Sequence, residues 1–134
     1  MLNGTESPER RTMERKAWKI QLRERLLKFS ISVITLANQL PKSAAGFAIA
    51  NQVIRSGTSI GANNEEAQDA SSLKDFIQKL SISLREARET LYWLEVTKGS
   101  HLIEGSQIDS CMDECNELIS IFVRSIKSSK DKVI

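Results

Sequence analysis

Turn-forming and aromatic residues are scarce in this chain of 134 residues. Six glycines and two prolines are spread over its whole length, and aromatic residues make up 5% of it. Sandwiches and barrels built from short strands need turn residues far more often than this. Large aromatic anchors are also few, so the core must be built mostly from Leu, Ile, Val and Ala. The sequence therefore predicts an all-α protein with a single domain.

The sequence has neither a long hydrophobic run nor an amino-terminal secretion signal. Its longest uncharged run, Phe29 to Pro41, contains Ser, Thr, Asn and Gln, whereas a membrane-spanning helix needs about 20 mostly apolar residues. Apolar residues at 40% and charged residues at 27% are typical of globular proteins. We therefore expect a cytoplasmic protein that makes no use of a membrane.

Histidine and cysteine are scarce in this chain. The chain has one histidine, His101, and two cysteines, Cys111 and Cys115, whereas a structural zinc site takes four Cys or His ligands. A di-iron bundle needs two Glu-x-x-His motifs, and the glycines form no phosphate-binding loop of the P-loop or dinucleotide kind. We expect the cysteines to be buried free thiols, and the protein to be non-enzymatic, with no metal and no cofactor.

Apolar residues recur at steps of three and four along the chain, which is the period of a helix with one buried face. The clearest stripe runs from Trp18 to Leu40 and predicts a helix over residues 12–40 that ends before Pro41. A second helix should run from the tight connection at 41–43 to about residue 70.

Two further helices are marked by their starts. Ser71 or Ser72 can cap the third helix, and Asp75 three residues beyond Ser72 completes a box-like start. Gly105 with Ser106 opens the last helix. Short connections force sequential helices to lie antiparallel, which predicts an up-and-down four-helix bundle. The expected organisation is a flexible lead at residues 1–11, the bundle at residues 12–129 and a basic tail at residues 130–134.

Two glycines, Gly57 and Gly61, lie one turn apart inside the second helix. Each costs about 1 kcal/mol relative to alanine in a helix interior, so tertiary packing must compensate. Close approach of another helix is the simplest compensation, because glycines remove the side chains that hold two backbones apart. A kink or a loop at Gly57 is the alternative.

Positive charge gathers at both ends of the chain. Residues 1–28 contain eight basic and four acidic residues, and residues 124–134 contain four basic and one acidic residue. Basic residues recur every fourth position along the first helix, where a phosphate-binding surface and a solvated helix face explain them equally well. The candidate nucleic-acid-binding residues are Arg11, Arg15, Lys16, Lys19, Arg23, Lys127 and Lys130.

The third helix carries a second apolar strip beside the stripe that faces the core. Such a strip offers a surface to bury against another subunit. Two glutamates interrupt it, so we expect them to be paired, with Arg55 and Arg88 as the preferred partners. The candidate residues of an oligomer interface are Arg55, Ile82, Glu86, Glu89 and Trp93.

Three segments resemble a known family. The run RSGTSIGANNEEA at residues 55–67, with DFIQKL at 75–80 and EARETLYWL at 86–94, is similar to the four-helix bundle proteins named after intervening sequences in bacterial 23S ribosomal RNA genes. The same superfamily includes the accessory variability determinant of diversity-generating retroelements. The resemblance spans about residues 15–124.

This resemblance implies a small bacterial up-and-down bundle that assembles as a homopentamer. For the retroelement branch it further implies a basic ring that binds nucleic acid and a reverse transcriptase. It carries over no catalytic residue. Our hypothesis is a non-enzymatic oligomeric bundle that binds RNA or DNA non-specifically through its basic surface, in the retroelement case as an accessory factor for a reverse transcriptase. The alternative is a protein-interaction scaffold with no nucleic-acid role.

Overall fold

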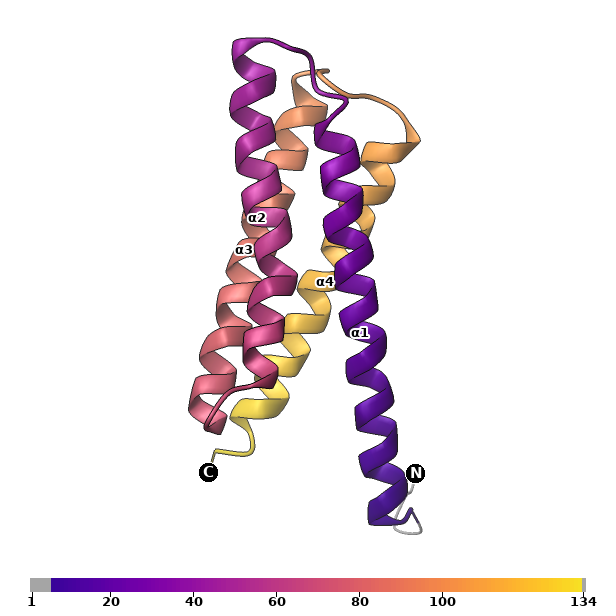
Figure 1. Ribbon diagram of the computed structural model, residues 1–134, viewed down its shortest axis with the longest axis vertical. Coiled ribbons are helices and arrows are strands. Elements are labelled where there is room, and N and C mark those ends of the chain that lie inside the picture. Colours follow the sequence, from indigo (N-terminus) through magenta and orange to yellow (C-terminus); the bar gives the residue numbers. More distant parts are fainter. Residues whose placement is uncertain (1–5, 134) are drawn as a thin grey trace.

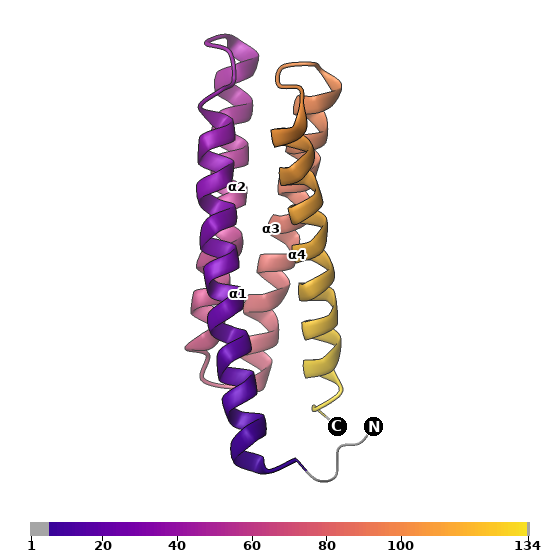
Figure 2. The same ribbon diagram turned by 90° about the vertical axis from the view of Figure 1, so that its right-hand side faces the viewer.

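The structure is a computed structural model that describes residues 6–133. Its helices follow one another as α1 (Pro8–Ala37), α2 (Ala44–Gln68), α3 (Leu73–Gly99) and α4 (Ser106–Lys130). Each helix runs antiparallel to the one before it, so α1 begins and α4 finishes at the same end of the molecule (Figures 1 and 2). The predicted all-α, up-and-down four-helix bundle is confirmed. Within residues 6–133, no helix is long and apolar enough to cross a membrane.

The first helix is longer at its start than the sequence predicts. It begins at Pro8, because the Ser7 side chain accepts a hydrogen bond of 3.1 Å from the backbone N–H of Arg10. Proline suits the first helical position, where no N–H is needed. Residues 8–11, expected in a flexible lead, are therefore helical, and residues 1–5 of that lead lie outside the described residues.

Serine side chains also cap the next two helices. The Ser43 hydroxyl accepts from the backbone N–H of Gly46 at 3.1 Å, and the Ser72 hydroxyl accepts from that of Asp75 at 3.0 Å. The cap predicted at Ser72 is confirmed. Gly105 precedes α4 with a φ of 107°. Glycine adopts this conformation without strain, so a glycine suits this position in the loop between α3 and α4.

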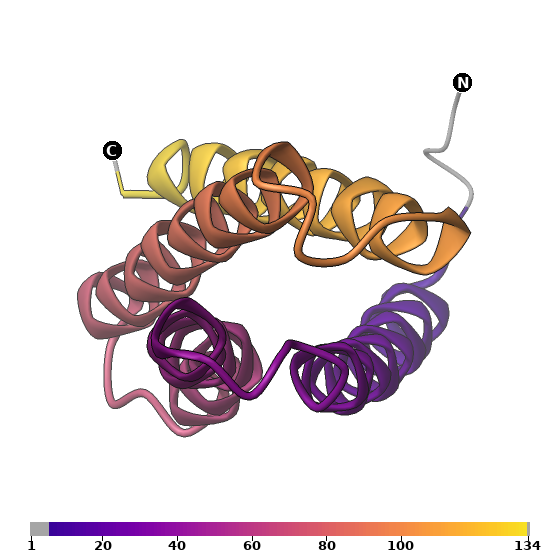
Figure 3. The same ribbon diagram turned by 90° about the horizontal axis from the view of Figure 1, so that it is seen from above.

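The core lies between the four helices, which enclose it as a ring when the bundle is seen from above (Figure 3). The predicted stripe on α1 is buried from Leu22 to Leu36, but Trp18, which the same spacing placed in the core, is 47% exposed. The first turns of α1 extend past the level where the other helices fill the interior (Figure 1). The helical period therefore continues further along α1 than the core does.

The inner surfaces of α2 and α3 meet through small polar side chains. The Thr90 hydroxyl donates to Ser56 Oγ at 2.9 Å, and the Ser83 hydroxyl donates to the backbone oxygen of Ile60 at 2.9 Å. All these side chains are buried, and buried hydroxyls need such partners. Small residues thus let α2 and α3 pack closely without leaving these hydroxyls unpaired.

Gly57 of α2 packs tightly against the Val33 side chain of α1. A methyl group added at Gly57 would lie 2.8 Å from Cγ1 of Val33, whereas one added at Gly61 would lie 3.5 Å from Cβ of Leu26, an ordinary contact. Helix α2 is continuous through both glycines, so the alternative of a loop at Gly57 is wrong. The predicted close packing is present, and it is tightest at Gly57.

This geometry predicts opposite effects for two matched substitutions. Gly57→Ala should lower the free energy of unfolding by about 1–3 kcal/mol, because overpacking against fully buried Val33 strains the core. Gly61→Ala should raise it by up to about 1 kcal/mol, since the helix gains propensity without a clash. Denaturant unfolding followed by circular dichroism measures both values. Equal stabilisation by the two substitutions would contradict close packing at Gly57.

Candidate nucleic-acid interface

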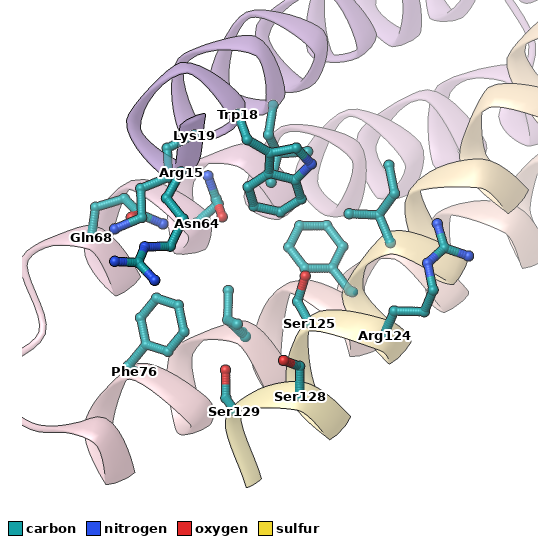
Figure 4. Close-up of a pocket in the computed structure, with 14 residues that line it drawn as sticks. Arg15, Trp18, Lys19, Asn64, Gln68, Phe76, Arg124, Ser125, Ser128 and Ser129 are labelled. Atoms are coloured by element: carbon teal, nitrogen blue, oxygen red, sulfur yellow. The ribbon is translucent and has the colours of Figure 1, made fainter. Parts of the chain in front are cut away.

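A pocket of about 400 Å³ opens at the end of the bundle where α1 begins and α4 finishes. All four helices contribute to it, and Figure 4 shows its polar and aromatic side chains converging from different helices. Buried Leu22, Leu80 and Phe122 form its apolar part. The other lining residues are Arg15, Trp18, Lys19, Asn64, Gln68, Phe76, Ile121, Arg124, Ser125, Ser128 and Ser129.

Three cations and no carboxylate line this pocket. Arg15 and Lys19 come from α1 and Arg124 comes from α4, and all three side chains are exposed. None of them forms an ion pair with a carboxylate of the described residues. We call these three residues the cationic rim. Their positive charge is therefore available to an anionic ligand.

The remaining candidate basic residues lie in other surroundings. Arg23 forms an ion pair of 2.6 Å with Glu65 on α2, which offsets its charge. Arg11 donates to the backbone oxygen of Glu6 at 2.5 Å, and Lys16 is exposed on α1. Lys127 and Lys130 line a separate shallow depression between α3 and α4. The structure thus brings Arg15 and Lys19 to the pocket and leaves the other candidates outside it.

Sequence reasoning missed several residues of this pocket. Arg124 contributes to the positive charge of residues 124–134 but is not among the candidate binding residues, and the apolar spacing places Trp18 in the core. Asn64 and Phe76 lie on α2 and α3 and have no local motif that points to a site. The one usable signal was Arg124, because it lies three residues before Lys127 on α4 and extends the basic end of that helix.

Polar contacts hold α1 against α4 beyond the pocket. The Arg25 guanidinium donates two hydrogen bonds to the carboxylate of Glu114, with N–O distances of 2.6 and 2.8 Å. The hydrogen bond to Glu114 raises the pKa of Arg25 above its usual value. Towards the far end, the Gln39 amide donates to Gln107 Oε1 at 2.7 Å. These contacts position α1, and hence Arg15 and Lys19, relative to Arg124.

The candidate interface residues on α3 already have partners within the chain. Arg55 of α2 forms ion pairs with both Glu86, at 3.3 Å, and Glu89, and the Trp93 indole donates to Glu89 at 3.0 Å. The predicted pairing of the two glutamates with Arg55 is confirmed. Ile82 and Trp93 are half-buried. This strip therefore offers less free apolar surface than its sequence indicates.

Helix α1 instead carries an apolar stripe on the face opposite the core. Its members recur mainly every seven residues, the spacing of a helix that packs against another helix. They are all more than two-fifths exposed. The stripe consists of Met13, Ile20, Leu27, Ile31 and Ile34.

The two cysteines and the histidine do not line the pocket. Both cysteines are buried free thiols, as predicted, and the Cys115 thiol donates to the backbone oxygen of Ala87 at 3.2 Å. Burial raises the pKa of Cys111 to about 11 and that of Cys115 to about 12. Because only the thiolate is a good nucleophile, both are unreactive at neutral pH. His101 is exposed in the loop between α3 and α4, beside Glu104. Nowhere in residues 6–133 do three His, Cys, Asp or Glu side chains gather closely enough to hold a metal ion.

The fold and the site together define a small all-α bundle with a cationic pocket at one end. The chain belongs to the 23S rRNA-intervening sequence protein family, whose model matches residues 19–124. It is similar to a solved protein of unknown function from the S23 ribosomal protein family of Bacteroides thetaiotaomicron. The two are 38% identical, with a TM-score of 0.74 over 78% of this chain and 97% of that one. No functionally curated protein matches the chain.

Proposed function

We propose that this protein is a non-enzymatic bundle that binds RNA or DNA non-specifically through phosphate contacts at its basic end. The cationic rim supplies the central contacts, and Arg11 and Lys16 extend them along α1. Lys127 and Lys130 add positive charge on the neighbouring face of α4. Nucleic-acid backbones are recognised in this way, by Lys and Arg side chains that neutralise phosphates.

The observation that carries this proposal is that the pocket is lined by three cations and by no carboxylate. Acidic residues nearly equal basic ones in this chain, 17 against 19, so a local surplus of three cations requires a specific arrangement. Arg23, Arg25 and Arg55 all have carboxylate partners. Arg15, Lys19 and Arg124 have no such partners among the described residues and line one pocket, so together they favour an anion from outside.

The exposed apolar stripe on α1 favours a second role, self-assembly. Isolated apolar side chains on a surface are ordinary, but a continuous stripe with heptad spacing fits a helix–helix contact. We propose that copies of this chain associate through this stripe. The pentamer and the reverse-transcriptase partner that the resemblance implies remain expectations, and the mass of the assembly would give the subunit number.

Phosphate binding predicts a steep salt dependence. Anisotropy of a labelled single-stranded RNA of about 20 nucleotides should show affinity that falls as salt rises. The triple variant Arg15→Gln, Lys19→Gln, Arg124→Gln should bind more weakly, and the slope of log K against log salt should shrink by about 2, since each phosphate contact contributes about 0.7.

The matched control is the triple variant Lys42→Gln, Lys74→Gln, Arg85→Gln. These three side chains are exposed and lie outside the pocket, so this protein has the same net charge as the first variant. It should retain the wild-type slope. No binding at low salt, or an equal loss in both triple variants, would contradict the proposed interface.

Self-assembly through α1 predicts that a single charge in the stripe lowers the mass. Ile31→Glu should shift light scattering towards the monomer, because it buries a carboxylate in an apolar contact. Phe47→Glu is the control, since Phe47 is 60% exposed on α2 and Ile31 is 56% exposed. If Ile31→Glu keeps the wild-type mass and Arg55→Ala lowers it, the interface lies on α3 as the sequence indicated. A monomeric wild type would contradict both.

A further inference from the structure

We infer that the pocket behind the cationic rim receives one unstacked nucleotide, with its base inside the pocket and its phosphate at the rim. The nucleotide is free or belongs to a bound single strand. Binding of a nucleotide that belongs to a single strand rests on the proposed function. The inference goes further, because phosphate contacts alone need no cavity.

The size and lining of the pocket fit such a ligand. Its volume of about 400 Å³ falls within the roughly 300–1,000 Å³ of small-molecule sites, which are mostly apolar with a few polar groups that fix orientation. Here Leu22, Leu80 and Phe122 supply apolar surface, and the cations lie at the exposed mouth. The pocket thus combines an apolar interior with a positively charged mouth, as a base with an attached phosphate requires.

Two aromatic side chains offer surfaces for a base. Trp18 of α1 remains 47% exposed, and Phe76 of α3 is half-buried. Figure 4 shows their rings on different sides of the pocket. A base that stacks on an exposed aromatic ring gains about 1–3 kcal/mol, and every base has a π-face. This accounts for the exposure of a tryptophan whose spacing belongs to the core stripe.

A buried amide with an unmet hydrogen bond lines the same pocket. Asn64 is 2% exposed, and its Oδ1 atom has no hydrogen-bond partner in the described chain. A buried acceptor without a donor destabilises a folded protein by about 1–3 kcal/mol, so its retention needs a reason. The Watson–Crick edge of a base carries N–H donors that proteins read in single strands. A base in the pocket would supply the missing donor, and Gln68 places a second carboxamide beside it.

The rim and the neighbouring serines suit the phosphate. Arg15 and Arg124 lie on opposite sides of the pocket in Figure 4. Ser125 and Ser128 of α4 also line the pocket. Charge-assisted hydrogen bonds from arginine to phosphate oxygens are among the strong ones. A phosphate at the mouth would lie between cations from α1 and α4, so the bound nucleotide would bridge these two helices.

Fluorescence of Trp18 tests this inference directly. Trp93→Phe leaves Trp18 as the only tryptophan of the chain. In this protein, adenosine monophosphate and a single-stranded RNA of about eight adenosines should quench the indole, whereas ribose 5-phosphate, which has no base, should not. The same RNA in a duplex should quench less, because its bases are stacked and paired.

Asn64→Leu separates ligand binding from a structural role. Removal of an unsatisfied acceptor should leave the melting temperature unchanged or raise it. The same substitution should weaken the binding of adenosine monophosphate several-fold, because the base loses a hydrogen-bond partner. Asn116→Leu, at an exposed position of α4 outside the pocket, is the matched control and should bind like the parent protein. Trp18→Leu should lower the affinity for a labelled single strand by about 5- to 150-fold, the range that corresponds to the loss of one stacked base.

The outcomes distinguish this inference from the proposed function. Salt-dependent RNA binding with no quenching by any ligand, and equal affinity for single strand and duplex, would overturn the nucleotide pocket and leave the phosphate interface standing. Quenching by adenosine monophosphate without binding of any RNA would support the pocket for a free nucleotide and overturn the proposed function. If neither ligand binds, both are wrong.

Discussion

The fit of Val33 against Gly57 fixes the position of α1, and the rest of the structure depends on it. On this side the Val33 side chain lies so close to Gly57 that a single added methyl group would clash with it. On its other side α1 meets α4 through the Arg25–Glu114 ion pair, and Gln39, just after α1, donates to Gln107. Close packing on one side and polar contacts on the other thus hold α1 in place. The pocket lies towards the start of α1, where residues of all four helices line it.

Three cations without carboxylate partners among the described residues gather at this pocket. Carboxylates on α2, α3 and α4 pair with Arg23, Arg55 and Arg25, where they join neighbouring helices. Exposed pairs of this kind contribute little to stability, but they offset the charge of Arg23 and Arg25 on α1. Arg15 and Lys19 of α1 keep their charge and lie with Arg124 at the cationic rim. The function we propose therefore rests on which cations lack partners rather than on the net charge of +2.

The helices could be predicted from the sequence, whereas the pocket could not. Periodicity and capping depend on near neighbours, which is why the bundle and the cap at Ser72 were predicted. Local spacing does not reveal where the core ends, so Trp18 was wrongly placed inside. It also does not reveal which of two glycines faces Val33. Asn64, Phe76 and Arg124 come together only through tertiary packing, since they lie on three different helices.

Hydrogen–deuterium exchange of the protein with and without a single-stranded RNA tests the central claim most directly. The account predicts slower amide exchange on RNA binding at residues 11–23 of α1 and 121–130 of α4, where the strand would contact both helices. Residues 82–96 of α3 should exchange as in the free protein. Protection confined to residues 82–96, or bound RNA with no change at the basic end, would contradict it.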